Sequence, residues 1–326
     1  MTAVTGGDER LAARLSALPG PAHRVAAAAV VTPGAARTAG LGTGLEADFE
    51  IGSISKGVTG LLYAEAIARG EIEPTTRLAE LLPLEGTPVG RVTLESLSTH
   101  RSGLPSLPSS SHPLRRTLAL WRHGANPYGE DLAQLLDQAR GVRLGRPRPR
   151  YSNFGFELLG HALAGAAATT YAALLRERIT EPLGLDRCYA PAGADELRPG
   201  ALHGTSRRGR PRGTWTGEAV APAGGIRASI GAMARLTGAL LDGTAPGVTA
   251  LDPIAPFGAG SRIGAAWITI RVKGRDITWH NGGTGGFRSW LGLDRDAGVG
   301  VVILSATAAS VDRYGFALLA DHRTAA

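Results

Sequence analysis

Residues 49–60 read Phe49-Glu50-Ile51-Gly52-Ser53-Ile54-Ser55-Lys56-Gly57-Val58-Thr59-Gly60, and an apolar run continues through residue 64. A helix over this stretch brings Ser53 and Lys56 onto one face, because residues three apart are neighbours on a helix surface. Ser53 then lies at the helix start, where unpaired backbone N–H groups can hold a developing oxyanion. Lys56 lies within reach of the Ser53 hydroxyl and can take its proton. The pattern predicts a serine nucleophile, although by itself it is more often an N-cap beside a solvated amine.

Lysine is rare in this chain. Lys56 and Lys273 are the only lysines among 35 basic residues, and the others are arginines. Arginine does not lose its proton in proteins, whereas a buried lysine can. A chain that uses arginine almost everywhere therefore keeps lysine where a deprotonatable amine is useful, which favours a chemical role for Lys56.

The composition is that of a globular protein with a large core, organised as one composite domain or two interleaved ones. The chain has 326 residues, 43% of them hydrophobic, and a net charge of +7 that comes from arginine. The arginine runs at 140–150 and 207–212 are not interleaved with aromatic residues, so we expect no nucleic-acid partner. The single cysteine, Cys188, has no partner for an internal disulfide.

The N-terminal residues carry mixed charges and no continuous apolar segment, and the first apolar run, 25–31, is too short to span a membrane. We therefore expect no signal peptide, no membrane partner and a cytoplasmic location. Thiol-metal spacings are absent, and the glycine run 282–286 precedes a strand rather than the helix of a phosphate loop. We expect neither a metal nor an organic cofactor. The sequence carries no signal for an oligomeric state.

Strands are predicted at both ends of the chain, with helices between them. The expected strands are 24–31, 35–41 and 46–52, and later 263–273, 276–280, 287–294 and 299–305. Helical periodicity covers 93–99, 129–139, 153–166, 168–180, 228–241 and 310–321. We predict an α/β (α+β) fold in which both chain ends pair into one antiparallel sheet around an inserted, mainly helical region. Residues 1–326 then form a single unit, with about 20–62 and 246–326 in the sheet part and about 63–245 in the helical part.

Tyr151-Ser152-Asn153 follows a Pro- and Arg-rich break and precedes a predicted helix. A loop just before a helix can project a tyrosine into a cleft while the helix holds its backbone. A neighbouring ammonium and arginines favour the phenolate, so we expect Tyr151 to act as general base toward Ser53 and later as general acid to the leaving group. The Asn153 amide can donate to a substrate carbonyl and accept from Lys56. A packed tyrosine beside an N-cap is the alternative.

His280-Asn281-Gly282-Gly283-Thr284-Gly285-Gly286 ends a predicted strand. A strand edge beside the nucleophile can place a backbone N–H opposite that of Ser53 and close an oxyanion hole. Gly282 and Gly283 permit the close approach that this requires. We expect His280 to line the cleft, and Gly282 and Thr284 to border the substrate. The alternative is a glycine turn with an incidental histidine.

In the order Ser-x-x-Lys, Tyr-x-Asn and His-x-Gly, these three motifs resemble those of the serine β-lactamase-related hydrolases. The closest likeness is to the branch that contains class C β-lactamases, D-aminopeptidases and carboxylesterases. The resemblance runs from about residue 25 to 306. It includes Thr93-Leu94-Glu95-Ser96-Leu97-Ser98-Thr99-His100-Arg101-Ser102-Gly103-Leu104-Pro105, Glu181-Pro182-Leu183-Gly184-Leu185 and Ala223-Gly224-Gly225-Ile226-Arg227-Ala228-Ser229.

The resemblance implies a β-lactamase/transpeptidase-like fold and a role for each motif. It makes Ser53 the nucleophile, activated by Lys56 and Tyr151. It implies that Asn153 contacts the acyl group and that the N–H groups of Ser53 and Gly283 form the oxyanion hole. His280 stands where true β-lactamases carry the lysine of a Lys-Thr-Gly motif, and a neutral imidazole binds a carboxylate less firmly than an ammonium does. Together with the missing signal peptide, this argues against a β-lactamase or a cell-wall DD-peptidase.

We therefore predict a serine hydrolase of the esterase, amidase or peptidase type, acting through a covalent acyl-enzyme on Ser53. Its partner is a small-molecule or peptide acyl substrate. Two alternatives stay open: an acyltransferase or cyclase of a biosynthetic pathway that uses the same acyl-enzyme, and a non-catalytic binding protein. Loops 105–128 and 200–222 are expected to form the cleft walls, and Arg150 with Arg148 to favour an acidic acyl donor.

Overall fold

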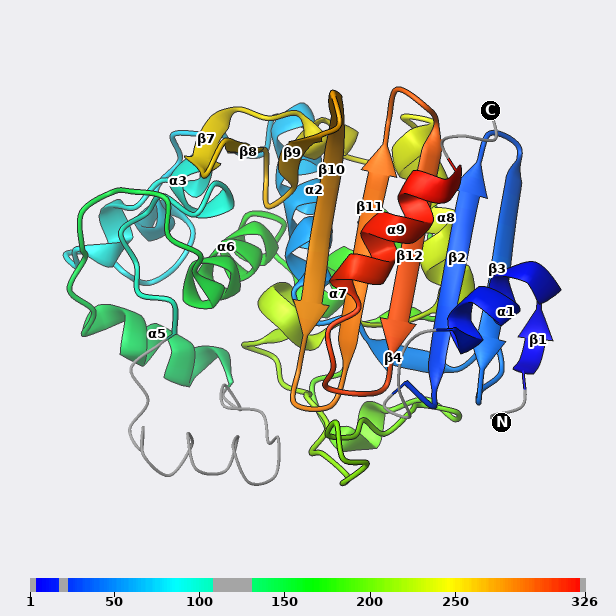
Figure 1. The fold of residues 1–326 in the computed structure, drawn as a ribbon. Helices are drawn as coiled ribbons and strands as arrows, with labels where there is room; N and C mark the ends of the chain where they lie inside the picture. Colours follow the sequence, from blue (N-terminus) through cyan, green and yellow to red (C-terminus); the bar gives the residue numbers. More distant parts are fainter. Residues whose placement is uncertain (1–3, 18–22, 108–130, 323–326) are drawn as a thin grey trace.

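The computed structural model describes residues 4–17, 23–107 and 131–322. In these ranges nine strands form one antiparallel sheet (Figure 1), in the order β1-β3-β2-β12-β11-β10-β9-β8-β7. The strands are β1 Val4–Gly7, β2 Ala26–Thr32, β3 Ala35–Leu41, β7 Ala255–Gly258, β8 Ser261–Ile263, β9 Ile268–Val272, β10 Arg275–Gly283, β11 Arg288–Asp294 and β12 Val299–Ser305.

Strands from the two ends of the chain meet in the middle of this sheet. β2 pairs antiparallel with β12, with Ala26 opposite Ser305 and Val31 opposite Gly300. The prediction that both chain ends build one antiparallel sheet is confirmed. The strand predicted over 263–273 is divided, because Gly264 N donates to the carbonyl of Trp267 and the chain turns between β8 and β9.

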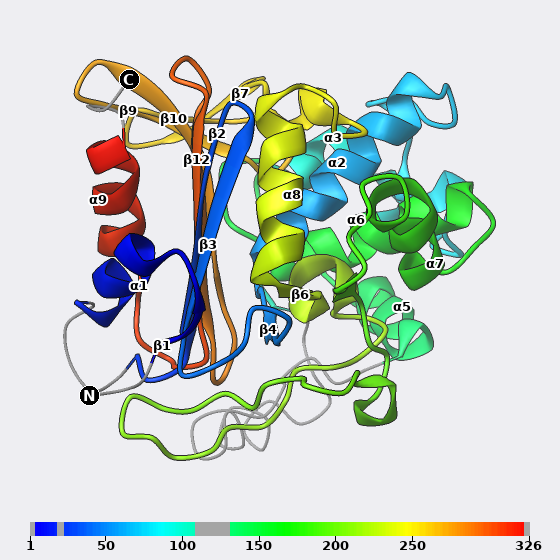
Figure 2. The same ribbon diagram turned by 90° about the vertical axis from the view of Figure 1, so that its right-hand side faces the viewer.

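Helices cover both faces of the sheet (Figure 2). α1 Glu9–Ser16 and α9 Asp312–His322 lie on one face, and α2 Ile54–Ala68 and α8 Ile230–Leu241 lie on the other. The inserted region beyond α2 contains α3 Leu94–Ser98, α5 Leu132–Arg140, α6 Asn153–Ala166 and α7 Tyr171–Leu175. Short 3₁₀ and π turns are η1 Leu78–Glu80, η2 Val89–Arg91, η3 Arg176–Thr180, η4 Ala194–Glu196, η5 Ala221–Gly225 and η6 Val248–Leu251.

β2 shows how the sheet accommodates helices on both sides. Its residues 26–31 are all buried, and four of them are alanines. Ala27 and Ala29 join the core that contains α2 and α8, whereas Ala26 and Ala28 join the core that contains α1 and α9. Successive side chains of a strand point to opposite faces, so a strand between two helical layers is apolar at every position.

Two regions differ from the sequence-based expectation. Residues 228 and 229, predicted to begin a helix, belong instead to β6 Arg227–Ser229, which joins β4 Asp48–Glu50 and β5 Cys188–Tyr189 in a second sheet. β1 and α1 lie where the sequence predicts no element. The division of the chain at about residue 245 stays a prediction. α8 falls within the predicted helical part, yet it packs against β2 and β12.

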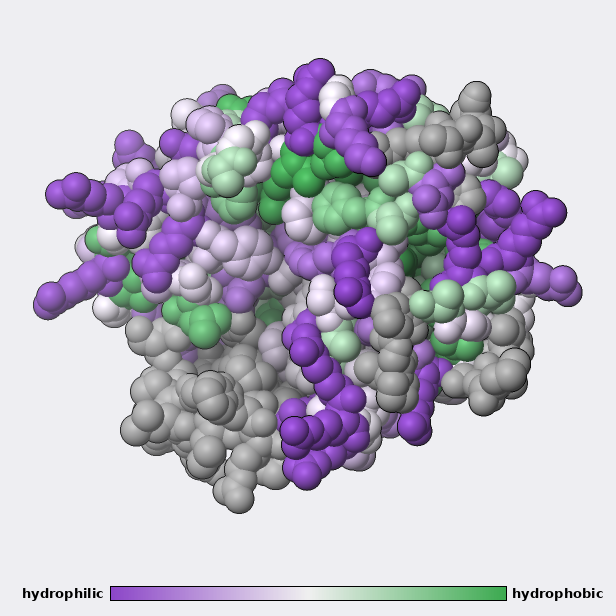
Figure 3. Space-filling model, viewed as in Figure 1, coloured by the Kyte–Doolittle hydropathy of each residue, from purple (hydrophilic) through white to green (hydrophobic). Residues whose placement is uncertain are grey.

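In the view of Figure 1 hydrophilic residues cover much of the coloured surface, and a connected hydrophobic area lies in its upper middle part (Figure 3). Within the described ranges no single helix has both the length and the apolar composition to cross a membrane. Only the pair formed by α6 and residues 171–180, bent by 80°, reaches that length. Residues 154–164 of α6 are buried within the protein core.

The second sheet contains a buried ion cluster. Arg227 Nε donates to Asp48 Oδ1 at 2.5 Å, and Arg227 Nη1 donates to Glu50 Oε1 at 3.3 Å. The three side chains are at most 1% exposed. β4 leads directly into Ser53, so this cluster fixes the strand that delivers the predicted nucleophile to the helix start.

Replacing Arg227 by methionine tests how much the fold depends on this cluster. We expect Arg227→Met to lower the free energy of unfolding by about 3–5 kcal/mol, because two carboxylates then stay buried without their cation. Urea unfolding followed by circular dichroism measures the change. Arg91→Met, at an exposed arginine, is the matched control. A loss for Arg227→Met as small as that of the control would contradict the expectation.

Candidate active site

Ser53 lies at the start of α2, where the chain turns from β4 into the helix. It is the N-cap residue, but its hydroxyl makes no capping bond. Ser53 Oγ instead lies 3.0 Å from Lys56 Nζ. The preceding Gly52 has a φ of +52°, and a Cβ at this position would come within 2.5 Å of Gly283 N. The turn that presents the hydroxyl therefore requires glycine.

Lys56 is fully buried beneath Ser53. Its exposed fraction is 0%, and its Nζ bonds Ser53 Oγ and the carbonyl oxygen of Ala223 in η5. Burial lowers the pKa of Lys56 from 10.5 to about 7, while the charge of Glu157 acts in the opposite direction. An amine with this pKa is partly unprotonated near neutral pH and can accept the Ser53 proton.

Tyr151 also contacts Ser53. The Tyr151 hydroxyl hydrogen-bonds the Ser53 side chain, and Lys56 Nζ lies 5.0 Å from the centroid of the Tyr151 ring. The phenolate expected from the sequence is not favoured. Burial raises the pKa of Tyr151 above its ordinary value, and the bond to Ser53 offsets only part of this effect. Tyr151 therefore keeps its proton at neutral pH and can act as a hydrogen-bond donor.

His100 holds the segment that carries Tyr151. The ring centroids of His100 and Tyr151 lie 4.5 Å apart, and Ser152 N donates to His100 Nδ1 at 3.1 Å. Burial, with a smaller effect of the Lys56 charge, lowers the pKa of His100 well below its ordinary value, so the imidazole is neutral. His100 was not predicted to be a site residue. The signal was present, because His100 belongs to the segment 93–105 on which the family resemblance rests.

The end of β10 lies tightly against the chain before α2. A Cβ on Gly282 would come within 2.0 Å of the Ile51 carbonyl oxygen. The same oxygen accepts a hydrogen bond from Ser289 Oγ in β11 at 2.7 Å. A strand edge can therefore reach the nucleophile only where it lacks side chains, as the glycines of the third motif predict.

The orientation of the Gly283 N–H follows from the strand register. Gly283 pairs with Arg288, and the next residue, Thr284, donates its N–H to the carbonyl of Phe287 at 3.2 Å. Hydrogen-bonded and non-hydrogen-bonded pairs alternate along an antiparallel ladder, so the N–H of Gly283 points away from β11. Gly283 N adjoins Gly52 on that side. This arrangement suits a second oxyanion donor beside Ser53.

His280 is buried beside Tyr151 rather than at the surface of the cleft. Its exposed fraction is 1%, its ring centroid lies 6.3 Å from that of Tyr151, and its Nδ1 lies 2.6 Å from the Asn281 carbonyl oxygen. Burial, followed by the charge of Lys56, lowers the pKa of His280 to about 4. The imidazole is neutral at pH 7 and presents no cation to an anionic substrate.

An open cleft of about 870 Å³ extends from Ser53 and Tyr151. Its other described lining residues come from segments 212–215, 281–288 and 310–312: Arg212, Trp215, Asn281, Gly282, Gly283, Thr284, Gly285, Arg288, Ser310 and Asp312. Gly282, Gly283 and Thr284 thus border the cleft. Of the two expected walls, segment 200–222 contributes Arg212 and Trp215, and residues 108–128 lie outside the described residues.

The remaining two predicted contacts are Asn153 and Arg150. Asn153 is the first residue of α6, and its backbone N–H donates to the Ser106 carbonyl at 3.0 Å. Arg150 is exposed and is not among the described lining residues. Arg212 and Arg288 line the cleft instead. Neither arginine was predicted to be a site residue. Arg212 lies in an arginine run typical of a solvated surface, and Arg288 lies in an ordinary strand pattern.

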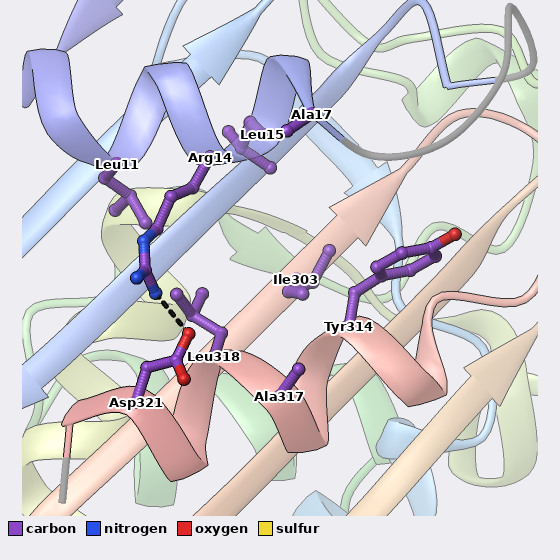
Figure 4. A pocket seen from close by; sticks show the side chains of 9 residues that line it. All are labelled: Leu11, Arg14, Leu15, Ala17, Ile303, Tyr314, Ala317, Leu318 and Asp321. Carbon is purple, nitrogen blue, oxygen red and sulfur yellow. Dashed lines mark hydrogen bonds and ion pairs between the residues drawn. The ribbon is translucent and has the colours of Figure 1, made fainter. Parts of the chain in front are cut away.

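A second hollow, of about 220 Å³, lies between α1 and α9 (Figure 4), on the face of the sheet opposite to α2. Its described lining is mostly apolar, and an ion pair of 2.6 Å joins Arg14 to Asp321 at its edge. It contains no serine, lysine or histidine among those residues. Within the described chain no cluster of three or more His, Cys, Asp or Glu side chains could hold a metal ion.

The lowered pKa of Lys56 predicts the pH dependence of Ser53 reactivity. Below pH 7 the amine is protonated and cannot accept a proton, and above pH 7 it is neutral. We expect labelling of Ser53 by a fluorophosphonate to accelerate as the pH rises, with a midpoint near pH 7. Lys56→Arg should abolish labelling, whereas Lys273→Arg, at the other lysine, should leave it unchanged. A midpoint near that of a solvated lysine would show that burial does not govern Lys56.

A family model described as Beta-lactamase matches residues 12–324. Among curated proteins, unguisins hydrolase ungD' from Aspergillus campestris is 29% identical over 253 residues, which make up 70% of this chain and 45% of that protein. D-alanyl-D-alanine-carboxypeptidase/endopeptidase AmpH from Escherichia coli is 30% identical over 156 residues, which make up 45% of this chain and 38% of that protein. The chain spans less than half the length of these curated relatives.

Solved structures show the same fold over nearly the whole chain. A class C beta lactamase from Rhodobacter sphaeroides has a TM-score of 0.75 at 21% identity, covering 92% of this chain and 93% of that one. A beta-lactamase/D-alanine carboxypeptidase from Pseudomonas syringae has a TM-score of 0.78 at 18% identity, covering 93% and 94%. The expected β-lactamase/transpeptidase-like fold is therefore confirmed. With a family model that matches almost every residue, this chain belongs to the Beta-lactamase family.

Proposed function

We propose that this protein is a serine hydrolase that forms a covalent acyl-enzyme on Ser53 with an ester, amide or peptide substrate. One observation carries the proposal: Ser53 Oγ lies 3.0 Å from the amine of Lys56, and burial brings the pKa of that amine to about 7. An N-cap serine beside a solvated lysine, the alternative at the level of sequence, has neither the contact nor the burial.

Acylation follows from the positions of the reacting groups. Ser53 Oγ attacks the acyl carbon while its proton moves to the neutral amine of Lys56. The carbonyl oxygen becomes an oxyanion between the N–H groups of Ser53 and Gly283. The oxyanion then collapses and the bond between the acyl carbon and the leaving alcohol or amine breaks. The Tyr151 hydroxyl donates a proton to that leaving group and recovers one from the Lys56 ammonium. Water then attacks the acyl-enzyme, the bond between Ser53 Oγ and the acyl carbon breaks, and Ser53 regains its proton.

The acceptor of the acyl group separates a hydrolase from an acyltransferase or cyclase. Two of the similar proteins are named as a hydrolase and as a carboxypeptidase/endopeptidase, which supports water as the acceptor here. An amine or alcohol acceptor would use the same three groups. Product analysis with and without an added acceptor distinguishes the two.

The proposal is tested with p-nitrophenyl butyrate and intact-mass spectra recorded during turnover. We expect the wild type to release p-nitrophenol and to carry a butyryl adduct, because Ser53 is the acylated group. Ser53→Ala should show neither, since it lacks the nucleophile but keeps Lys56 and Tyr151. A stable adduct without turnover would favour acyl transfer. Equal rates in both proteins would exclude Ser53 as the nucleophile.

Among the described residues that line the cleft, two arginines stand against one carboxylate, Asp312, and this balance supports an anionic acyl donor. Arg212 and Arg288 line the cleft, and Arg288 Nη1 donates to the Thr284 and Phe287 carbonyl oxygens at 2.7 Å each. These bonds hold the guanidinium next to Gly283, where a Cβ would come within 3.0 Å of Arg288 Nη1. Because His280 is neutral, recognition of a carboxylate near the oxyanion hole would depend on these two arginines.

We expect Arg288→Gln to lower kcat/KM for a p-nitrophenyl monoester of a dicarboxylic acid about tenfold more than for the neutral butyrate, as loss of a charge-assisted hydrogen bond predicts. The ratio of the two substrates cancels any general effect on the 284–287 turn. Arg208→Gln, at an exposed arginine, is the control. Arg150→Gln tests the prediction made for Arg150 from the sequence. A selective loss of kcat/KM for the anionic substrate in Arg150→Gln, but not in Arg288→Gln, would place the anion site at residue 150.

A further inference from the structure

The Lys56 amine is bound by a turn from a distant part of the chain. Its Nζ donates to the carbonyl oxygen of Ala223, in the middle of η5. A carbonyl oxygen only accepts hydrogen bonds, so Lys56 donates here in both its protonated and its neutral form. In the neutral form this fixed N–H lets the lone pair of the amine face Ser53 Oγ, 3.0 Å away. The position of the Ala223 carbonyl therefore bears on how Lys56 accepts a proton.

A hydroxyl group of α2 holds the peptide bond that precedes Ala223. Thr59 lies three residues after Lys56 and is 0% exposed. Its Oγ1 donates to the Pro222 carbonyl oxygen at 2.7 Å and lies 2.7 Å from the hydroxyl of Tyr171 in α7. Thr59 thus joins α2, η5 and α7 at one buried point.

The direction of these hydrogen bonds follows from the number of protons. A threonine hydroxyl has one proton, and the Pro222 carbonyl can only accept. The Ser55 carbonyl oxygen, 3.1 Å from Thr59 Oγ1, can also only accept. If Thr59 donated to Tyr171, both of these oxygen–oxygen contacts would be left without a proton. Tyr171 therefore donates to Thr59, and Thr59 donates to η5.

The turn is confined on its other sides as well. Ile226 N, directly after η5, donates to Ser55 Oγ at 3.2 Å. A Cβ on Gly160 would come within 2.2 Å of Pro222 Cβ, so α6 lies directly against the proline. Packing sets the distance between η5 and α6. Hydrogen bonds are directional, so the hydroxyls of Thr59 and Ser55 set the orientation of the peptide groups in η5.

We propose that Thr59 is a positioning residue that orients η5 and thereby fixes the hydrogen bond between Ala223 and Lys56. This inference rests on the proposed function of Ser53 and Lys56. A charged donor makes the stronger hydrogen bond, so the Ala223 carbonyl favours the ammonium form of Lys56 and offsets part of the effect of burial. Without the Thr59 hydroxyl the carbonyl is no longer held toward the amine. Lys56 is then harder to protonate and less well aligned with Ser53.

The charges that face Lys56 do not depend on Thr59. The titratable groups around Lys56 include two imidazoles, two phenols and one carboxyl group: His100, His280, Tyr151, Tyr171 and Glu157. Burial keeps the imidazoles and the phenols neutral at pH 7. Burial also raises the pKa of the carboxyl group to about 8. The variants below change none of these charges, so a change in the titration of Lys56 reports on η5.

The two-lysine composition allows a test that needs no turnover. Protein labelled with ¹³C at lysine Cε gives two lysine signals, and the Lys273→Arg variant assigns them. We expect the titration midpoint of Lys56 to lie about one pH unit lower in Thr59→Val than in the wild type, as loss of a charge-assisted hydrogen bond predicts. Thr59→Ala, which leaves more room beside Pro222, should show the same shift. Thr59→Ser keeps the hydroxyl and should keep the wild-type midpoint. An unchanged midpoint in Thr59→Val and Thr59→Ala would overturn the inference.

Two control variants separate positioning from a general loss of stability. Thr237→Val removes another buried threonine hydroxyl, which donates to the Met233 carbonyl oxygen in α8 at 2.7 Å. Tyr171→Phe removes the donor to Thr59 but leaves Thr59 free to donate to Pro222. Both variants lose a buried hydrogen bond, yet both should keep the wild-type midpoint of Lys56. A shift in either control as large as that in Thr59→Val would count against the inference.

Kinetics supply a second readout. The acid limb of kcat/KM should move to lower pH in Thr59→Val by the same amount as the Lys56 midpoint, because a base with a lower pKa loses its proton at lower pH. A merely structural role would lower the rate at every pH and leave the limb in place. If Ser53→Ala showed that Ser53 is not acylated, the proposed function would fail, while the lysine titration would still decide whether Thr59 positions the turn.

Discussion

The removal of Lys56 from water is the constraint on which the rest of the site depends. A solvated lysine is an ammonium at neutral pH and cannot act as a base. At 0% exposure the charged form loses its hydration, and the pKa of Lys56 falls to about 7. The same burial keeps His100 and His280 neutral and Tyr151 protonated. In the proposed mechanism, this one physical effect makes the neutral amine the base and the phenol the acid.

This burial exists because the site lies where the sheet meets the helical region. α2 is covered on one side by the sheet and on the other by α6 and η5. The sheet supplies the glycine edge of β10, which adjoins Gly52. The helical region supplies Tyr151, held by His100, and the carbonyl of Ala223 that bonds Lys56. The buried Arg227 cluster anchors the strand that leads to Ser53. Each contact brings together segments far apart in the chain.

The sequence was most informative where the chemistry is local. Ser53 and Lys56 are one helical turn apart, so their contact follows from helix geometry alone. The sheet built from both chain ends followed from strand patterns at the two termini, and the structure confirms it. The sequence was least informative about groups whose neighbours come from distant parts of the chain. The expected phenolate at Tyr151 was wrong. The sequence shows the charged residues near Tyr151 but not its burial, and burial has the larger effect on its pKa. Arg288 went unnoticed because the cleft that it lines forms only when distant segments pack together.

The sequence alone is enough to name the candidate reactive groups, their order and the backbone that presents them. These are a serine and a lysine at a helix start, a tyrosine before a second helix, and a strand edge free of side chains. Helix and strand periods and the steric freedom of glycine are properties of short segments, so these features can be read from the chain. Which groups carry charge and which arginines reach the cleft depend on the folded chain. Protonation depends on the dielectric and the charges around a group, and those are created when distant segments pack together.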